Sequence, residues 1–206
     1  MRHIPSSDTL HAGVLPFEEA LKATAADYDR SRWLYVPDHY SEYRYILGTR
    51  GIHPLVCIGI NPSTAVPDRL DNTLKSAERI ALHNGYDSFI MFNVYAQRAT
   101  DPDDMEREFN PVLHQENMKA FAWLFSLFPN PPDLWAAWGT IIEKRPYLPS
   151  CVLDMASIGR QFGARWFTAG PRSKSGHPHH PLYLKKNVNL DPFSDMAEYL
   201  KSLGKT

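Results

Sequence analysis

The sequence predicts an α/β protein, folded as a three-layer α/β/α sandwich around a central, mainly parallel, four-stranded sheet. Four short apolar runs have the length and the near-continuous apolar character of strands that are buried on both faces. Stretches with apolar residues every three or four positions separate these runs, and strands that alternate with helices form parallel sheets through right-handed crossovers. A length of 206 residues fits one domain of this kind.

Each of the four apolar runs is bounded by Gly, Pro or Asp, which are turn-forming residues. The runs are 55–60 (LVCIGI), 88–94 (SFIMFNV), 133–138 (DLWAAW) and 165–169 (RWFTA). The first two are the most apolar, and the third, which is rich in Ala and Trp, is the weakest strand prediction.

Helices are predicted between and around these strands. Asp71 or Asn72 caps a helix that Gly85 ends, and a second helix begins at Pro111 and stops before Pro129. Further helices are expected over 16–28, 150–162 and 192–203. The aromatic and β-branched segment 32–51 suits a hairpin or an edge strand, and its place in the sheet stays open. We therefore expect a single domain, 1–206, in which 1–50 form an N-terminal helix and aromatic-rich extension and 51–206 form the core.

The composition excludes several classes of protein. With 43% apolar and 22% charged residues, the chain is neither disordered nor fibrous. Its formal net charge of -1 gives the whole molecule no field that attracts nucleic acid or an anionic membrane. Cys57 and Cys151 form no C-x-x-C pair, which excludes a disulfide framework and a cysteine-rich zinc site. No apolar stretch suits a secretory signal or a membrane span, so we expect a cytoplasmic protein without membrane contact. We further expect a monomer.

The residues after each strand are the candidates for a site, because ligands of open parallel sheets bind at the carboxyl ends of the strands. They are Gly59, Ile60, Asn61, Pro62, Ser63 and Thr64; Asn93, Tyr95, Gln97 and Arg98; Gly139 and Thr140; and Gly170 with 177–184 (HPHHPLYL). Gly59 permits close approach of a ligand to the backbone, and Asn61 offers an amide that both donates and accepts. A simple Asn-Pro turn is the competing interpretation.

Three histidines, His177, His179 and His180, stand together in the last of these segments. Pro178 and Pro181 break the spacing that metal ligands need, and no acidic residue is near, so we expect no metal and no cofactor. A rigid loop that presents one imidazole to a substrate oxygen is favoured, because imidazole stabilises an anionic leaving group near pH 7. Surface histidines in a Pro-rich loop are the plain alternative.

Residues 160–186 contain basic residues and no acidic ones. The basic residues are Arg160, Arg165, Arg172, Lys174, Lys185 and Lys186. This strip beside the histidines suits backbone phosphates, and Ser175 adds a hydroxyl donor. The near-neutral chain then predicts weak nonspecific DNA binding that depends on this strip.

These motifs resemble those of the uracil-DNA glycosylase superfamily. Gly59-Ile60-Asn61-Pro62 is similar to the G-I-N-P of the mismatch-specific uracil and thymine glycosylases. The second strand ends in Asn93, as the base-reading strand does in uracil glycosylases. Ala137-Trp138-Gly139 resembles the third strand, and His177-Pro178 with His180-Pro181-Leu182 is similar to the H-P-S-P-L motif. The blocks occur in the expected order over 55–184. The whole chain also resembles a bacterial and phage family with G-x-N-P-S-T and H-P-x-H-P-L-Y-L blocks.

The resemblance implies a metal-free, monofunctional DNA glycosylase that hydrolyses the N-glycosidic bond of a flipped-out mismatched, deaminated or modified pyrimidine. Such an enzyme would serve DNA repair or defence against phage with modified bases, on double-stranded or single-stranded DNA. Asn61 would hold the attacking water, and His180 or His177 would stabilise the departing base. We favour His180, because Pro181-Leu182 follows it directly. The implied substrate contacts are Gly59, Ile60, Pro62, Ser63, Asn93, Tyr95 and Arg98, with Phe92 as a further stacking candidate, and the implied DNA contacts are Arg172, Lys174, Ser175 and Lys185.

The chain also departs from this pattern. Asn61 stands where the efficient uracil enzymes carry Asp, and an amide can position water but cannot deprotonate it. Ser63 replaces a glycine of the mismatch-specific branch. Two alternatives therefore stay open: a nucleic-acid-binding module of the same fold without turnover, and a metal-dependent hydrolase that uses His177, His179 and His180.

Overall fold

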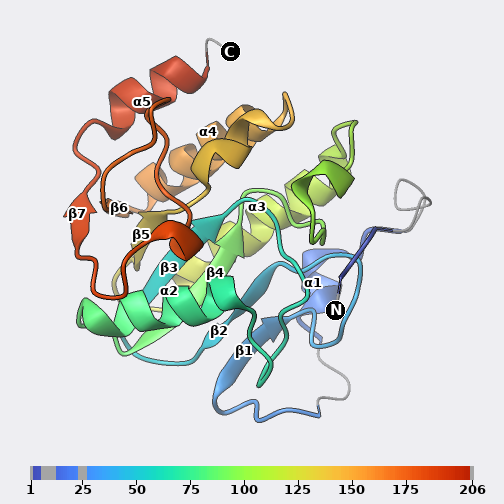
Figure 1. Cartoon of the computed structure of the whole chain (residues 1–206). Coiled ribbons are helices and arrows are strands. Elements are labelled where there is room, and N and C mark those ends of the chain that lie inside the picture. Colours follow the sequence, from blue (N-terminus) through green and yellow to red (C-terminus); the bar gives the residue numbers. More distant parts are fainter. Residues whose placement is uncertain (1, 6–12, 23–26, 205–206) are drawn as a thin grey trace.

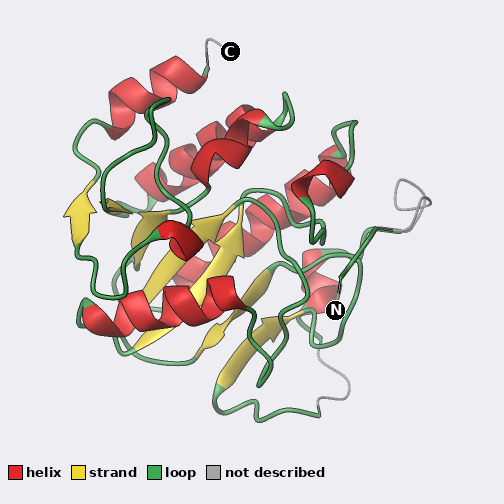
Figure 2. Ribbon diagram, viewed as in Figure 1, coloured by secondary structure: helices red, strands yellow, loops and turns green. Residues whose placement is uncertain are grey.

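The protein is an α/β protein with one mixed sheet between two helical layers (Figure 1 and Figure 2). The computed structural model describes residues 2–5, 13–22 and 27–204. Their sheet has seven strands in the order β1-β2-β4-β3-β5-β6-β7. The α/β class is therefore confirmed, whereas the prediction of a four-stranded, mainly parallel sheet is wrong.

The four predicted strands form the middle of this sheet as neighbours. They are β3 (Pro54–Gly59), β4 (Ser88–Asn93), β5 (Asp133–Ala136) and β6 (Trp166–Ala169), each parallel to the next in the order β4-β3-β5-β6. Both β3 and β4 are buried along their whole length, as expected for strands that are covered on both faces. Their carboxyl ends meet, because Gly59 pairs with Asn93 in the register.

Three antiparallel edge strands extend this middle part. The aromatic segment forms the hairpin strands β1 (Trp33–Val36) and β2 (Ile46–Thr49), and β2 joins β4. At the other edge lies β7 (Leu190–Pro192), next to β6. These edge strands form by hydrogen bonding to segments that are distant in the sequence. The local hydrophobic pattern therefore does not predict how many edge strands the sheet has.

Helices cover the two faces of the sheet unequally. One face carries α2 (Asn72–His83), which packs on buried side chains of that face such as Leu55 and Met91. The other face carries α3 (Pro111–Ser126) and α4 (Leu148–Gln161), which pack on Val56 and Phe92 (Figure 1). Alternate residues of the same strands thus serve the two cores.

The ends of α2 and α3 follow the predicted signals. The Asp71 side chain accepts from the Leu74 amide at 2.9 Å, and Gly85 has the positive φ of a helix end. The Asn110 side chain caps α3 in the same way, and Pro111 is its first residue.

The terminal helices are shorter than predicted. The first, α1, covers Phe17–Ala20, and residues 23–26 of the predicted 16–28 lie outside the described residues. The last, α5, covers Met196–Leu203, because the chain before it pairs in β7. Short 3-10 turns lie at η1 (Pro102–Asp104), η2 (Gly139–Glu143) and η3 (Pro181–Tyr183). Among the described residues, no helix has the length and apolar character to cross a membrane.

Gly48 lets the hairpin reach β4, and we expect Gly48→Ala to lower the free energy of unfolding by about 2–3 kcal/mol. A Cβ at this position would lie 2.2 Å from the Phe89 carbonyl oxygen and 2.7 Å from the Ile90 Cα, which are backbone atoms that cannot give way. Urea unfolding measures the loss. The control is Gly159→Ala in α4, where the Cβ would first meet Leu134 Cδ1 at 3.3 Å. Equal stability of the two variants would contradict this docking of the hairpin.

Candidate active site

A cavity of about 390 Å³ opens at the carboxyl ends of β3 and β4. Its walls come from the loops after these strands, from the start of α2, from Arg44 before β2, and from the histidine segment. The lining residues are Arg44, Gly59, Ile60, Asn61, Ser63, Thr64, Asp71, Asn72, Thr73, Leu74, Met91, Ala99, Thr100, Pro102, Ile141, His180, Leu182 and Tyr183. The structure thus brings Gly59, Ile60, Asn61, Ser63 and His180 together, as the sequence predicts.

The floor of the cavity lies where β3 and β4 end. A Cβ on Gly59 would lie 2.5 Å from Met91 Cε and 3.1 Å from Asn93 Nδ2, so a larger residue would force these two side chains to move, and glycine leaves the floor uncrowded. Asn93 pairs with Gly59 in the sheet and is 1% exposed, so this predicted substrate contact lies behind the cavity wall and does not itself line the cavity. Its Nδ2 has no hydrogen-bond partner among the described residues, which is a costly state for a buried donor.

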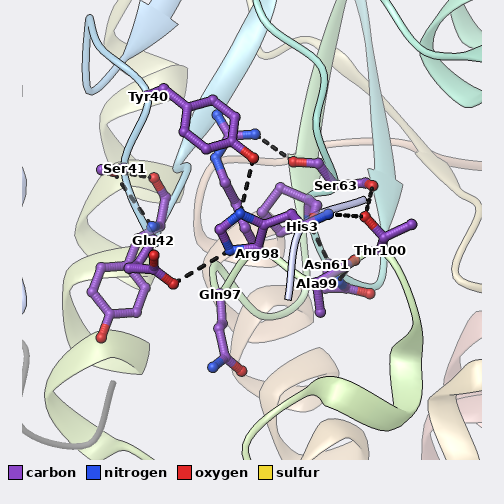
Figure 3. Close-up of polar contacts among 12 residues, drawn as sticks. His3, Tyr40, Ser41, Glu42, Asn61, Ser63, Gln97, Arg98, Ala99 and Thr100 are labelled. Carbon is purple, nitrogen blue, oxygen red and sulfur yellow. Dashed lines mark hydrogen bonds and ion pairs between the residues drawn. The ribbon is translucent and has the colours of Figure 1, made fainter. Parts of the chain in front are cut away.

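Asn61 is held by two hydrogen bonds that both use its amide nitrogen. Nδ2 donates to the Ala99 carbonyl at 2.8 Å and to the Pro62 carbonyl at 3.1 Å (Figure 3). The side-chain oxygen makes no hydrogen bond to the described residues and remains an acceptor on a cavity-lining residue. Pro62 itself does not line the cavity. Its carbonyl instead joins the two loops, because it also accepts from the Ala99 amide at 2.9 Å.

His180 is a neutral donor at the cavity wall. Burial lowers its pKa to about 4, although Asp71 acts in the opposite direction, so the imidazole is uncharged at pH 7. Its Nδ1 lies 3.4 Å from the Leu182 amide and accepts there, which leaves the proton on Nε2. An uncharged Nε2–H can donate to an oxygen that gains negative charge.

Because burial lowers the pKa of His180, we expect the free energy of unfolding to fall at acid pH. The His180→Ala variant should lack this part of the fall. The ordinary pKa of 6.5 holds in the unfolded chain, so the unfolded state takes up this proton first as pH falls. Stability is complete above pH 6.5 and declines toward pH 4, by about 3 kcal/mol at 1.4 kcal/mol per pKa unit. Urea midpoints of both proteins between pH 7 and pH 4 measure it. Parallel curves for the two proteins would contradict a buried neutral His180.

Arg44 also lines the cavity, although it belongs to none of the sequence motifs. The guanidinium is 1% exposed, and it donates to the Asn93 side-chain oxygen at 3.2 Å and to the Ala65 carbonyl at 3.3 Å. Burial lowers its pKa to about 9, which still leaves it charged at pH 7. Its Nε has no partner, and among the described residues no carboxylate lies within ion-pair distance. No sequence signal marks this position, because the reach of Arg44 depends on where the hairpin docks.

Asp71 is a second lining residue that motif analysis reads only as a helix cap. It precedes α2 and contributes the carboxylate of the cavity wall. Its charge opposes the effect of burial on the pKa of Arg44, Arg98 and His180. Asp71 therefore lies within electrostatic range of both walls of the cavity.

Tyr95 and Arg98 do not reach the cavity, contrary to the predicted substrate contacts. Tyr95 is fully buried, donates its hydroxyl to Glu106 and packs on Tyr147 at a ring distance of 4.9 Å. Arg98 is equally buried and donates to the Ser63 and Ala65 carbonyls and to the Tyr35 hydroxyl. It therefore positions the loop after β3 rather than contacting a phosphate. Phe92, the further stacking candidate, is likewise buried, against Phe121.

His177 faces a different cavity, of about 480 Å³, and both of its ring nitrogens have partners. Nδ1 lies 2.9 Å from the Tyr199 hydroxyl and Nε2 lies 2.7 Å from a Glu143 carboxylate oxygen. Of the two candidate histidines, His180 is thus the one that lies with Asn61. No cluster of three or more His, Cys, Asp or Glu side chains that could hold a metal occurs within the described part of the chain. The geometry therefore does not gather the ligands that a histidine-dependent metal hydrolase needs.

The predicted DNA contacts divide into paired and unpaired groups. Arg172 forms an ion pair with Asp195 and lies over the Phe193 ring at 4.3 Å, so it is tied to the fold. Arg165 of the same strip pairs with Asp133. Lys174, Ser175 and Lys185 are exposed. In the basic strip, Lys174 and Lys185 are thus exposed and can contact phosphate, whereas Arg165 and Arg172 are engaged in ion pairs within the protein.

The N-terminal segment is fastened to the loop that follows β4 (Figure 3). The His3 amide donates to Thr100 Oγ1 at 2.7 Å, and its ring contacts the Tyr40 hydroxyl at 2.9 Å and a Glu42 oxygen at 3.3 Å. Ser63 donates to the same Thr100 oxygen at 3.1 Å. The segment 2–5 therefore stabilises one wall of the cavity.

Residues 44–182 match the family described as a protein of unknown function, DUF1643. The chain belongs to this family. Arg44 and Leu182, at the two ends of the DUF1643 match, both line the cavity, and every lining residue except Tyr183 falls between them. No curated protein and no solved structure matches the chain. For this DUF1643 protein, function is therefore argued from the site itself.

Proposed function

We propose that the protein is a DNA glycosylase that hydrolyses the N-glycosidic bond of a flipped-out mismatched, deaminated or modified pyrimidine. The observation that carries this proposal is the cavity that brings together the free Asn61 oxygen, the neutral His180 imidazole and the buried Arg44 guanidinium, with the Asn93 amide directly behind its wall. A flipped base must be read by hydrogen bonds to its edge within a pocket, and a cavity of about 390 Å³ has room for one.

The hydrogen-bond donors at the cavity floor favour a base whose Watson–Crick edge carries acceptor atoms. Two of the buried side-chain atoms without a hydrogen-bond partner among the described residues lie here, and both are donors: Arg44 Nε, on a lining residue, and Asn93 Nδ2, behind Gly59. The Asn93 oxygen is already used by Arg44 at 3.2 Å. A carbonyl oxygen of a pyrimidine can pair with such donors, whereas an exocyclic amino group would add a further donor.

The chemistry needs a water near the sugar and a donor near the base. Glycosidic cleavage passes through an oxocarbenium-like state, in which the sugar becomes positive and the base negative. The Asn61 oxygen accepts from the water and holds it, and His180 Nε2–H donates to the departing base. Because His180 is uncharged, its hydrogen bond strengthens as negative charge develops.

Exposed apolar residues at the rim suit entry into a DNA helix. Leu182 is 47% and Tyr183 79% exposed at the mouth of the cavity, next to His180. Apolar side chains that enter between base steps unstack and kink DNA, which helps a base to leave the stack. Lys174 and Lys185 then contact the backbone phosphates. We assign this reaction to a cytoplasmic monomer that acts on double-stranded or single-stranded DNA, in repair or in defence against modified phage DNA.

Base release from DNA tests the proposal. Purified protein is incubated with oligonucleotides that carry uracil, thymine mismatches or modified pyrimidines, and with phage DNA of varied base content. Released base is detected by mass spectrometry and abasic sites by alkaline cleavage. We expect release from at least one substrate without strand cleavage before alkali, as a monofunctional enzyme requires. DNA binding without release from any substrate would instead indicate a nucleic-acid-binding module.

A further inference from the structure

Asp71 supplies a carboxylate to a site in which Asn61 cannot act as a base. Both residues line the same cavity, together with His180. An amide has no useful affinity for a proton, so Asn61 can orient a water but cannot remove its hydrogen. Among the cavity-lining residues, Asp71 alone carries a carboxylate.

Asp71 has one carboxylate oxygen in use and one free. Oδ1 accepts from the Leu74 amide at 2.9 Å, which is the N-cap of α2 and fixes the side chain at the cavity wall. No residue that the structure describes donates to Oδ2. A carboxylate oxygen has room for further donors, and a water molecule in the cavity is one.

Two positively charged side chains lie within electrostatic range of the Asp71 carboxylate. Arg44 and Arg98 are both cationic, both buried and both within its electrostatic range, and neither forms an ion pair with another carboxylate of the described residues. His180, the remaining titratable group of the cavity that interacts with Asp71, is neutral. The two buried guanidinium groups balance the negative charge that Asp71 brings to the cavity wall.

We propose that Asp71 is the general base of the reaction, and this inference rests on the proposed glycosylase function. Asp71 Oδ2 takes one proton from the water that the Asn61 oxygen holds. The water oxygen forms the new bond to C1′ as the bond from C1′ to the base nitrogen breaks, and that electron pair leaves with the base. His180 donates a hydrogen bond to the base anion, which takes a proton from solvent after release, and Asp71 returns its proton to solvent.

Asp71→Asn tests this role with little effect on the fold, because asparagine is as good an N-cap as aspartate. We expect base release at substrate saturation to fall by about 10²–10⁴-fold, the usual contribution of a general base, with KM changed little. Asp191→Asn in β7, an exposed residue outside the cavity, is the control for loss of one negative charge.

Asp71→Ser is the second variant, since serine also caps a helix and carries no carboxylate. Added formate should restore part of its activity, which a purely structural role would not allow. A wild-type enzyme that releases base, with an Asp71→Asn variant equally fast, would overturn the role of Asp71 alone. A folded wild-type protein that releases no base from any substrate would overturn the proposed function, and the role of Asp71 with it.

Discussion

Replacing His180 with alanine is expected to slow base release by about 10²–10³-fold, the usual cost of one donor to a developing oxyanion. In the proposed reaction the neutral Nε2–H donates to the departing base, and alanine offers nothing in its place. Single-turnover base release measures this loss. The fold should remain, because the His180 ring makes one hydrogen bond to the described residues, and that bond, from the Leu182 amide, is long, at 3.4 Å.

His177→Ala is the matched control for this effect. His177 is 5% exposed and binds Tyr199 and Glu143 on the side of the second cavity. Its loss removes one of the two partners of the Tyr199 hydroxyl, which keeps the Trp138 Nε1 donor at 2.8 Å, so we expect the free energy of unfolding to fall by about 1–3 kcal/mol. The rate per folded molecule should stay close to wild type. The opposite result, with His177→Ala inactive and His180→Ala active, would exchange the roles of the two histidines.

Asn61→Asp is expected to destabilise the protein by about 2–3 kcal/mol and to bring no gain in rate. The substitution imitates the efficient uracil enzymes in sequence. In this chain, however, Nδ2 donates to the Ala99 and Pro62 carbonyls, and a carboxylate oxygen in its place would face two acceptors. Removing the donor therefore disturbs the contact between the loops after β3 and β4.

Asn72→Asp makes the same chemical change at another residue of the cavity wall. Asn72 is exposed at the first position of α2, where an added negative charge favours the helix dipole. Urea unfolding should thus show a loss for Asn61→Asp and no loss for Asn72→Asp. An Asn61→Asp variant of wild-type stability that releases base faster would contradict the hydrogen bonds assigned to Asn61.

Local signals in the sequence predict the middle of the sheet and the start of the helices. The near-continuous apolar runs mark β3 and β4, and Asp71 and Pro111 mark the first turns of α2 and α3, because burial and helix starts depend on a few neighbouring residues. The edges of the sheet depend instead on pairing between distant segments, such as Leu47 with Met91. Such pairing has no local signature.

The sequence likewise predicts only part of the candidate site, namely the residues that stand in short motifs after strands. Asn61 and His180 stand in short motifs after strands and could be selected from the sequence. Arg44 reaches the cavity only because the hairpin docks on β4, and Asp71 has the ordinary appearance of a helix cap. Tyr95 follows a strand as a site residue would, yet its side chain turns into the core toward Glu106.

Base release by the wild-type protein and by His180→Ala, side by side on one panel of modified DNA, tests the central claim most directly. The account predicts free base and alkali-labile abasic sites with the wild-type protein, and about 10²–10³-fold slower release with the variant at equal fold stability. A correctly folded wild-type protein that binds these DNAs and leaves every glycosidic bond intact would contradict it.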